Sequence, residues 1–159
     1  MRIGIIIGRI GGVDGVALET EKWIDVLKSM GHDIFILSGQ FQERNMNPDT
    51  ETLVPEMSFF SPESYWSQKK AFFHPETNPE ELIEHLNLYS KVIYKKIISW
   101  SKNQALDLII SENASALPSH LEMGLAINKA VTKLGIPTIT HDHDFAWERG
   151  ERYVSPYQV

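Results

Sequence analysis

Short runs of apolar, β-branched residues constrain the fold of this chain more than any other feature. Residues 2–8 read RIGIIIG, residues 33–39 read DIFILSG and residues 105–111 read ALDLIIS. Runs of this length that end in glycine or serine are typical of strands buried on both faces of a parallel sheet. Residues 136–140, IPTIT, form another expected strand. TLVPEM at 52–57 is a weaker candidate that its proline restricts to a sheet edge.

Segments with the spacing of amphipathic helices lie between these runs. We expect helices over residues 16–30, 61–73, 78–100 and 117–134. The expected buried stripe of the first helix consists of Val16, Thr20, Trp23, Leu27 and Met30. Gly31 and Gly135 suit the left-handed residue just past a helix end. The alternation predicts βαβ units, and therefore one α/β, Rossmann-like domain over residues 1–159. We expect it to be doubly wound, with a mainly parallel sheet and helices on both faces.

Composition excludes several classes of function. The net charge is −6 and the Lys and Arg residues are scattered, so no basic stripe is present to follow a nucleic-acid backbone. The absence of cysteine excludes disulfides and thiolate metal sites. No apolar stretch approaches the roughly 18–20 residues of a membrane span. With 159 residues the chain can form one compact core, and we expect a soluble cytoplasmic domain.

A glycine-rich turn separates the first expected strand from the first expected helix. Its glycines are Gly8, Gly11, Gly12 and Gly15. Such a turn lets a ligand approach the backbone, and free N–H groups at a helix start can bind phosphate. The spacing departs from the dinucleotide fingerprint because Ile10 occupies the place of its second glycine. A P-loop is excluded because no Gly-Lys-Ser/Thr follows. The alternative is a tight turn in which the glycines serve backbone geometry alone.

Polar residues follow two of the expected parallel strands. Glu112 and Asn113 leave one strand, and the sequence HDHD at 141–144 leaves another. The carboxyl ends of parallel strands meet at one edge of the sheet, where ligands of open α/β proteins bind. We therefore expect these two segments and the glycine loop to converge on one site.

The HDHD segment supports several interpretations. On an extended segment His141 and His143 point the same way and could share a metal ion, whereas Asp142 faces away. The sequence does not place further ligands such as His120 or Glu112, so we expect no metal site. Asp144 is the expected N-cap of a helix over residues 145–153.

Three stretches together resemble the N-terminal half of a family-4 (group 1) retaining glycosyltransferase of the GT-B fold. GGVDGVALETEKWIDVLKSMGHDIFILSG (11–39) is similar to its opening glycine loop, first helix and entry to the second strand. LDLIISEN (106–113) is similar to its central strand and the polar residues that follow. LGIPTITHDHDFAWER (134–149) is similar to the segment whose histidine closes the N-terminal side of the cleft. The likeness covers about residues 1–39 and 105–152.

The resemblance implies a hexosyltransferase of carbohydrate biosynthesis. It would move a sugar from a nucleotide-sugar to a sugar or small hydroxyl acceptor, without a cofactor. His141 would be the catalytic residue that contacts the donor sugar, and Gly11 and Gly12 would line the cleft near the donor diphosphate. The residues implied in binding the acceptor are Glu112, Asn113, Asp142 and His143.

The family's C-terminal half carries a Glu-x7-Glu motif in a second doubly wound domain. Glu43/Glu51 and Glu76/Glu84 have this spacing but do not follow strands of such a domain, so we attribute both to chance. We expect an N-terminal, acceptor-side domain whose C-terminal donor domain is absent, and which is inactive alone. Two alternatives remain: a metal-dependent hydrolase using His141 and His143, and a non-catalytic Rossmann-like ligand-binding domain.

Overall fold

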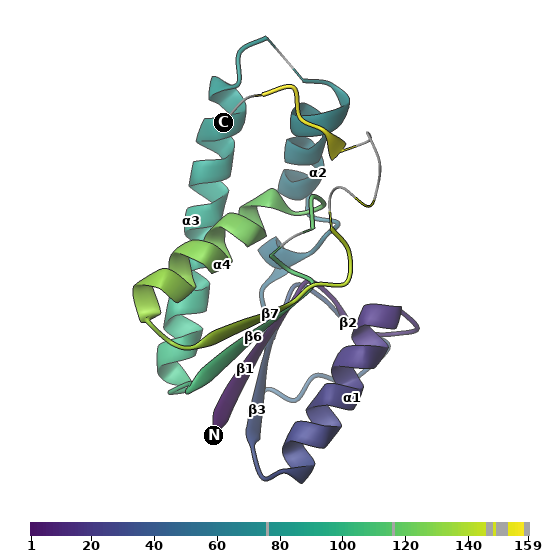
Figure 1. The fold of residues 1–159 in the computed structure, drawn as a ribbon, viewed down its shortest axis with the longest axis vertical. Helices are drawn as coiled ribbons and strands as arrows, with labels where there is room; N and C mark the ends of the chain where they lie inside the picture. The colour runs from purple at the N-terminus through teal and green to yellow at the C-terminus, as the bar shows by residue number, and fades with distance from the viewer. Residues whose placement is uncertain (76, 116, 146–147, 149–152, 158–159) are drawn as a thin grey trace.

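The computed structural model describes residues 1–75, 77–115, 117–145, 148 and 153–157. A five-stranded sheet forms its centre, in the order β5-β3-β1-β6-β7 (Figure 1). The strands are β1 (Arg2–Ile7), β3 (Asp33–Ser38), β5 (Glu51–Leu53), β6 (Leu108–Glu112) and β7 (Thr138–His141). Every neighbouring pair is parallel, which confirms the predicted α/β, Rossmann-like sheet. A small parallel pair, β2 (Ile10–Gly11) with β4 (Phe41–Gln42), lies beside it.

Helices cover both faces of this sheet, as predicted. One face packs against α1 (Gly15–Ser29), and the other packs against α3 (Glu80–Asn103) and α4 (Leu121–Leu134) (Figure 1). Between β5 and α3 the chain forms η1 (Pro55–Met57), α2 (Pro62–Gln68) and the π-helical turn η2 (Lys69–Phe73). Among the described residues, no helix has both the length and the apolar character needed to cross a bilayer.

The core forms because successive residues of β1 point to opposite faces. Ile5 and Ile7 pack with Ile24 of α1, whereas Ile6 packs with Ile97 of α3. All five of these isoleucines are at most 5% exposed. Full burial of one such side chain stabilises the fold by roughly 1.5–3 kcal/mol. This explains why an uninterrupted apolar run predicted a strand buried on both faces.

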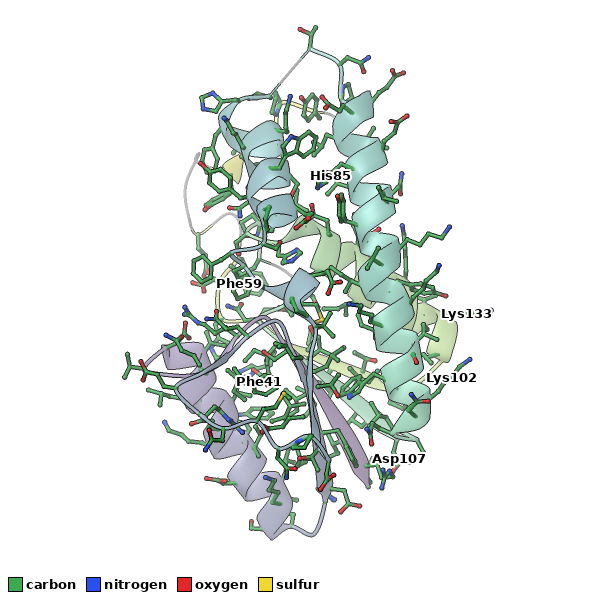
Figure 2. The ribbon with its side chains drawn as sticks, turned by 180° about the vertical axis from the view of Figure 1, so that it is seen from behind. Phe41, Phe59, His85, Lys102, Asp107 and Lys133 are labelled. Atoms are coloured by element: carbon green, nitrogen blue, oxygen red, sulfur yellow. The ribbon has the colours of Figure 1, made fainter. Side chains whose placement is uncertain are left out.

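The long helix α3 extends beyond the carboxyl edge of the sheet. Its 24 residues span about 36 Å, whereas a six-residue strand spans about 20 Å. The amino-terminal half of α3 therefore lies alongside α2 past the strand ends (Figure 1). Figure 2 shows His85 between these two helices, where its ring stacks on Trp66 with centroids 4.3 Å apart. Helices α2 and α3 therefore lie beside the carboxyl edge of the sheet, where the site residues are.

The predicted buried stripe of α1 is confirmed in part. Thr20 is buried, and Val16 and Leu27 pack against the core as expected. Ala17 and Ile24 are also buried, whereas Met30 is 64% exposed and Trp23 stacks on His141. Helical spacing alone does not distinguish these neighbouring positions.

Three strand boundaries also differ from the prediction. β6 begins at Leu108, and Ala105, with φ +46°, cannot be part of an extended strand. β7 ends at His141, so the first histidine of HDHD belongs to the strand rather than to the loop. The weak strand candidate at 52–57 does lie at a sheet edge, but β5 covers only Glu51–Leu53, and Pro55–Met57 form the 3-10 turn η1. The expected helix over residues 145–153 lies mostly outside the described residues.

Candidate functional site

Strand register places Glu112 and His141 side by side at the carboxyl edge of the sheet. Ile110 packs on the α1 face, so Glu112, two residues further along β6, faces the same side. The Glu112 side chain is 1% exposed, and its Oε2 and Oε1 lie 3.0 and 3.3 Å from Nδ1 of His141. An ionised carboxylate can only accept, so Nδ1 donates this hydrogen bond. In the neutral form of the imidazole, Nε2 is then left as a hydrogen-bond acceptor.

A residue of helix α1 contacts the face of the His141 ring. Trp23 stacks on it with centroids 4.7 Å apart and an interplanar angle of 24°. The indole Nε1 donates to Glu19 Oε1 at 3.3 Å, one helical turn away. Hydrogen bonding and charge from Lys22 lower the pKa of Glu19 most strongly, and His141 makes a smaller contribution. The His141 ring is therefore fixed by a carboxylate at its edge and an indole on its face.

His143 joins the same group. Its Nε2 lies 3.6 Å from Glu112 Oε2, and its ring centroid lies 4.4 Å from that of His141. The prediction that the two histidines point the same way is thus confirmed. Asp142 is not part of the group, and its Oδ1 is buried without a hydrogen-bond partner among the described residues.

Asn113 organises the backbone around both histidines. Its N–H donates to the His141 carbonyl at 2.8 Å, and its Oδ1 accepts from the N–H groups of His143 and Asp144 at 3.1 and 3.3 Å. Asn113 has φ +47°, a left-handed conformation that asparagine tolerates better than most residues. It is 4% exposed, so the structure supports a role as scaffold of the loop.

The glycine loop is constrained by the chain itself. Gly11 has φ +88°, and a Cβ there would lie 2.0 Å from the Gln42 carbonyl oxygen of the paired strand β4. Gly12 also has a positive φ, +69°. Packing within the chain therefore requires Gly11, independently of any ligand. No hydrogen bond or ring contact between described residues joins Gly11 or Gly12 to the Glu112–His141 group.

The amino-terminal end of α1 already has an anionic partner. Asp14 Oδ1 accepts from the N–H groups of Val16 and Ala17 at 2.8 and 3.2 Å. Arg9 pairs with the same carboxylate. Partial burial by itself raises the pKa of Asp14, but the hydrogen bonds and the charge of Arg9 outweigh it and hold the pKa below its ordinary value. This carboxylate bonds the N–H groups at the helix start that were expected to be free to bind a phosphate.

A second histidine–glutamate cluster lies where α2, α3 and α4 meet. Glu122 is fully buried, and its Oε1 lies 3.1 Å from His85 Nε2. His120, 1% exposed, donates from Nε2 to the Glu56 carbonyl, and its Nδ1 lies 3.2 Å from both the Met123 N and Glu122 Oε2. Both histidines therefore have partners within the fold. Beside the cluster, an open groove of about 390 Å³ is lined by Pro62, Glu63, Trp66, Glu81, His85 and Tyr89.

Sequence reasoning found His141, His143, Glu112 and Asn113, and the structure brings these four together. It missed Trp23, which it assigned to the buried stripe of α1. The contact of Trp23 with His141 depends on how α1 crosses the sheet, for which the sequence has no clear signal.

Two curated proteins align with nearly the whole chain. The chain is 28% identical to the mannosylglucosylglycerate synthase of Petrotoga mobilis over 150 residues. It is 29% identical to that of Thermotoga maritima over 158 residues. Each alignment covers 94% of this chain and 33% of the relative, so the chain spans about a third of the length of these curated relatives.

Other comparisons add little. No family model matches the chain. The C-terminal domain of a hydrogenase from Pyrococcus furiosus has a TM-score of 0.47 and 13% identity, covering 88% of this chain and 91% of that one. A likeness at this level carries no argument here.

Proposed function

We propose that this chain is the N-terminal, acceptor-side domain of a retaining GT-B glycosyltransferase that uses a nucleotide-sugar donor. The observation that carries the proposal is the alignment of 94% of the chain with two sugar-transferring synthases. The Rossmann-like sheet and the polar site at its carboxyl edge support it, because ligands of open α/β folds bind at that edge. The whole enzyme would need a donor-binding domain in addition to these residues.

In this proposal His141 positions a hydroxyl of the donor sugar. Its Nε2 accepts a hydrogen bond from this hydroxyl because Nδ1 is bonded to Glu112. Such a contact orients the sugar while positive charge develops at the carbon that loses the diphosphate, and preorganised polar groups stabilise that charge. Glu112, 1% exposed, offers almost no surface to a substrate. We therefore assign it to the positioning of His141 rather than to acceptor contact.

The names of the relatives guide the choice of substrates. Both relatives are synthases of mannosylglucosylglycerate. Nucleotide-activated mannose and glucosylglycerate are therefore the first donor and acceptor to test. Exposed His143 and the loop fixed by Asn113 are the proposed acceptor-side contacts, with Asp142 beside them.

The test uses the complete protein that contains this chain and, separately, the 159-residue chain. Release of nucleoside diphosphate and formation of the glycoside are measured with the substrates above. We expect turnover only by the complete protein, and at least a hundredfold lower kcat for His141→Ala. His74→Ala, a histidine remote from the site in sequence and fold, is the matched control and should retain full activity. Sugar transfer by the 159-residue chain alone, or full activity of His141→Ala, would contradict the proposal.

A further inference from the structure

The carboxyl edge of β6 and β7 holds three side chains whose donor atoms converge. A carboxylate oxygen of Glu112 and one imidazole nitrogen each of His141 and His143 all lie within 4.8 Å of one another. We propose that these three residues bind one divalent transition-metal ion of the zinc class. The proposal stands independently of the proposed function.

The separations suit a metal ion. In a tetrahedral zinc site with bonds of about 2.0–2.2 Å, neighbouring ligand atoms lie roughly 3.3 Å apart. The Glu112 Oε2 is 3.0 Å from His141 Nδ1 and 3.6 Å from His143 Nε2, values on either side of that distance. The two imidazole nitrogens lie within 4.8 Å of each other, and the His143 side chain is 25% exposed. A small adjustment therefore completes three ligand positions.

The charge of buried Glu112 and the exposure of His143 favour the binding of a metal ion at this site. A carboxylate buried as deeply as Glu112 needs a compensating positive charge. Among the described residues its ion-pairing partners are the two histidines, with no lysine or arginine. Exposure on the His143 side leaves a fourth coordination position for water or a ligand, as in open zinc sites. Two imidazoles with one carboxylate select zinc, iron or manganese rather than magnesium or calcium.

The surrounding residues already fix the ligands. Asn113 binds the backbone at His141 and His143, and Trp23 packs on the His141 ring.

Metal binding would change what His141 offers to a substrate. Coordination through Nδ1 requires the single ring proton to reside on Nε2, so Nε2 becomes a donor instead of an acceptor. If the proposed function is correct, an occupied site has lost the acceptor that positions the sugar hydroxyl. We then expect zinc to inhibit transfer, whereas metal binding itself does not depend on that activity.

The experiment is a titration of the 159-residue chain, after treatment with a chelator, with Zn²⁺ by calorimetry and with Co²⁺ by visible absorption. We expect one equivalent to bind and the cobalt spectrum to indicate low-symmetry coordination. His143→Ala and Glu112→Gln should each raise the Kd at least tenfold, with folding checked by circular dichroism. His32→Ala, at the opposite end of the strands, is the matched control and should leave the Kd unchanged.

Equal, weak binding by the wild type and both ligand variants would overturn the proposal, because it would indicate adventitious contact with surface histidines. If Glu112→Gln does not fold, the Kd of His143→Ala alone tests the proposal, since the His143 side chain is partly exposed. Failure of this titration leaves the transfer assay of the complete protein untouched, so the two proposals fail separately.

Discussion

The molecule contains two clusters of one buried glutamate with two histidines, and they differ in what remains free. At the sheet edge, Glu112 is buried beneath His141 and His143, whose side chains are 31% and 25% exposed. Between the helices, Glu122 is buried with His120, whose Nε2 is bonded to a backbone carbonyl and whose Nδ1 lies 3.2 Å from Glu122 Oε2. The same residue types therefore form an accessible candidate site in one place and a buried structural cluster in the other. Access distinguishes the two clusters, whereas composition does not.

The sharpest test of this difference is the same substitution in both clusters. In the complete protein, Glu112→Gln should lower kcat by about 10- to 150-fold. The reason is that a hydrogen bond to a charged group contributes about 1.5–3 kcal/mol, and 1.36 kcal/mol corresponds to tenfold in rate. Unfolding and transfer assays on the same preparation separate the two effects. Loss of stability with unchanged kcat would mean that Glu112 is as structural as Glu122.

Glu122→Gln should show the reverse pattern. We expect a loss of about 1–3 kcal/mol in the free energy of unfolding, because the amide leaves buried polar partners unsatisfied, with kcat unchanged. Denaturant titration measures the first and the transfer assay the second. A fall in kcat larger than the fall in folded fraction would contradict the structural assignment.

The pH dependence of Glu122 sharpens the same contrast. Burial by itself raises the pKa of its carboxyl, but His120 and the Ser67 hydroxyl outweigh this and hold the pKa below its ordinary value of 4.5. A lowered pKa in the folded state contributes stability above about pH 4.5 that is lost as the pH falls through the lowered value. The stability difference between wild type and Glu122→Gln should therefore be constant near neutral pH and shrink below pH 4.5. A difference that grows on acidification would reverse the sign of this interaction.

Asn113→Gly tests the loop that carries His143, and we expect a loss of stability of intermediate size. Glycine keeps the left-handed φ of +47° but removes the side-chain hydrogen bonds to His143 and Asp144. We expect a loss of about 1–2 kcal/mol in stability, from roughly 1 kcal/mol for each bond. Asn113→Ala should cost about 1–2 kcal/mol more because alanine disfavours this φ. Equal stability of the two variants would show that the backbone relaxes there.

The smallest effect is expected for the stack that supports His141. Trp23→Leu removes an aromatic pair worth about 0.5–1.5 kcal/mol, so kcat in the complete protein should fall about 2- to 12-fold. Trp66→Leu is the matched change in the second cluster, where the same indole–imidazole stack exists on His85. It should alter stability but not kcat. Identical kinetic effects of both changes would remove the distinction between the clusters.

Local chemistry made much of the fold predictable. The run at residues 2–8 predicted a strand because β-branched residues in an uninterrupted series are buried on both sheet faces. Gly31 and Gly135 have φ +83° and +65°, as expected for residues that end helices. The joint orientation of His141 and His143 followed from the period of an extended chain. Each of these features depends on neighbours close in sequence.

Features that depend on distant pairing could not be predicted. Glu112 supports His141 only because β6 and β7 pair in a register that places them opposite each other, across 29 positions of sequence. Trp23 of α1 contacts His141 of β7, which lies far away in the sequence. Helices were expected near α2 and α3, but their position past the strand ends depends on how they pack against each other and against α4. The missing information in each case is tertiary geometry.

The pairing of β2 with β4 has a kinetic and entropic consequence. Ile10 pairs with Phe41 and Gly11 with Gln42, so two loops that leave neighbouring strands are tied to each other. Ordering a flexible loop on binding would cost roughly 1–2 kcal/mol for each residue fixed. A ligand that binds to this loop would not pay this cost, because the loop is already ordered in the folded chain. Association there would be limited by diffusion and orientation instead of by loop closure.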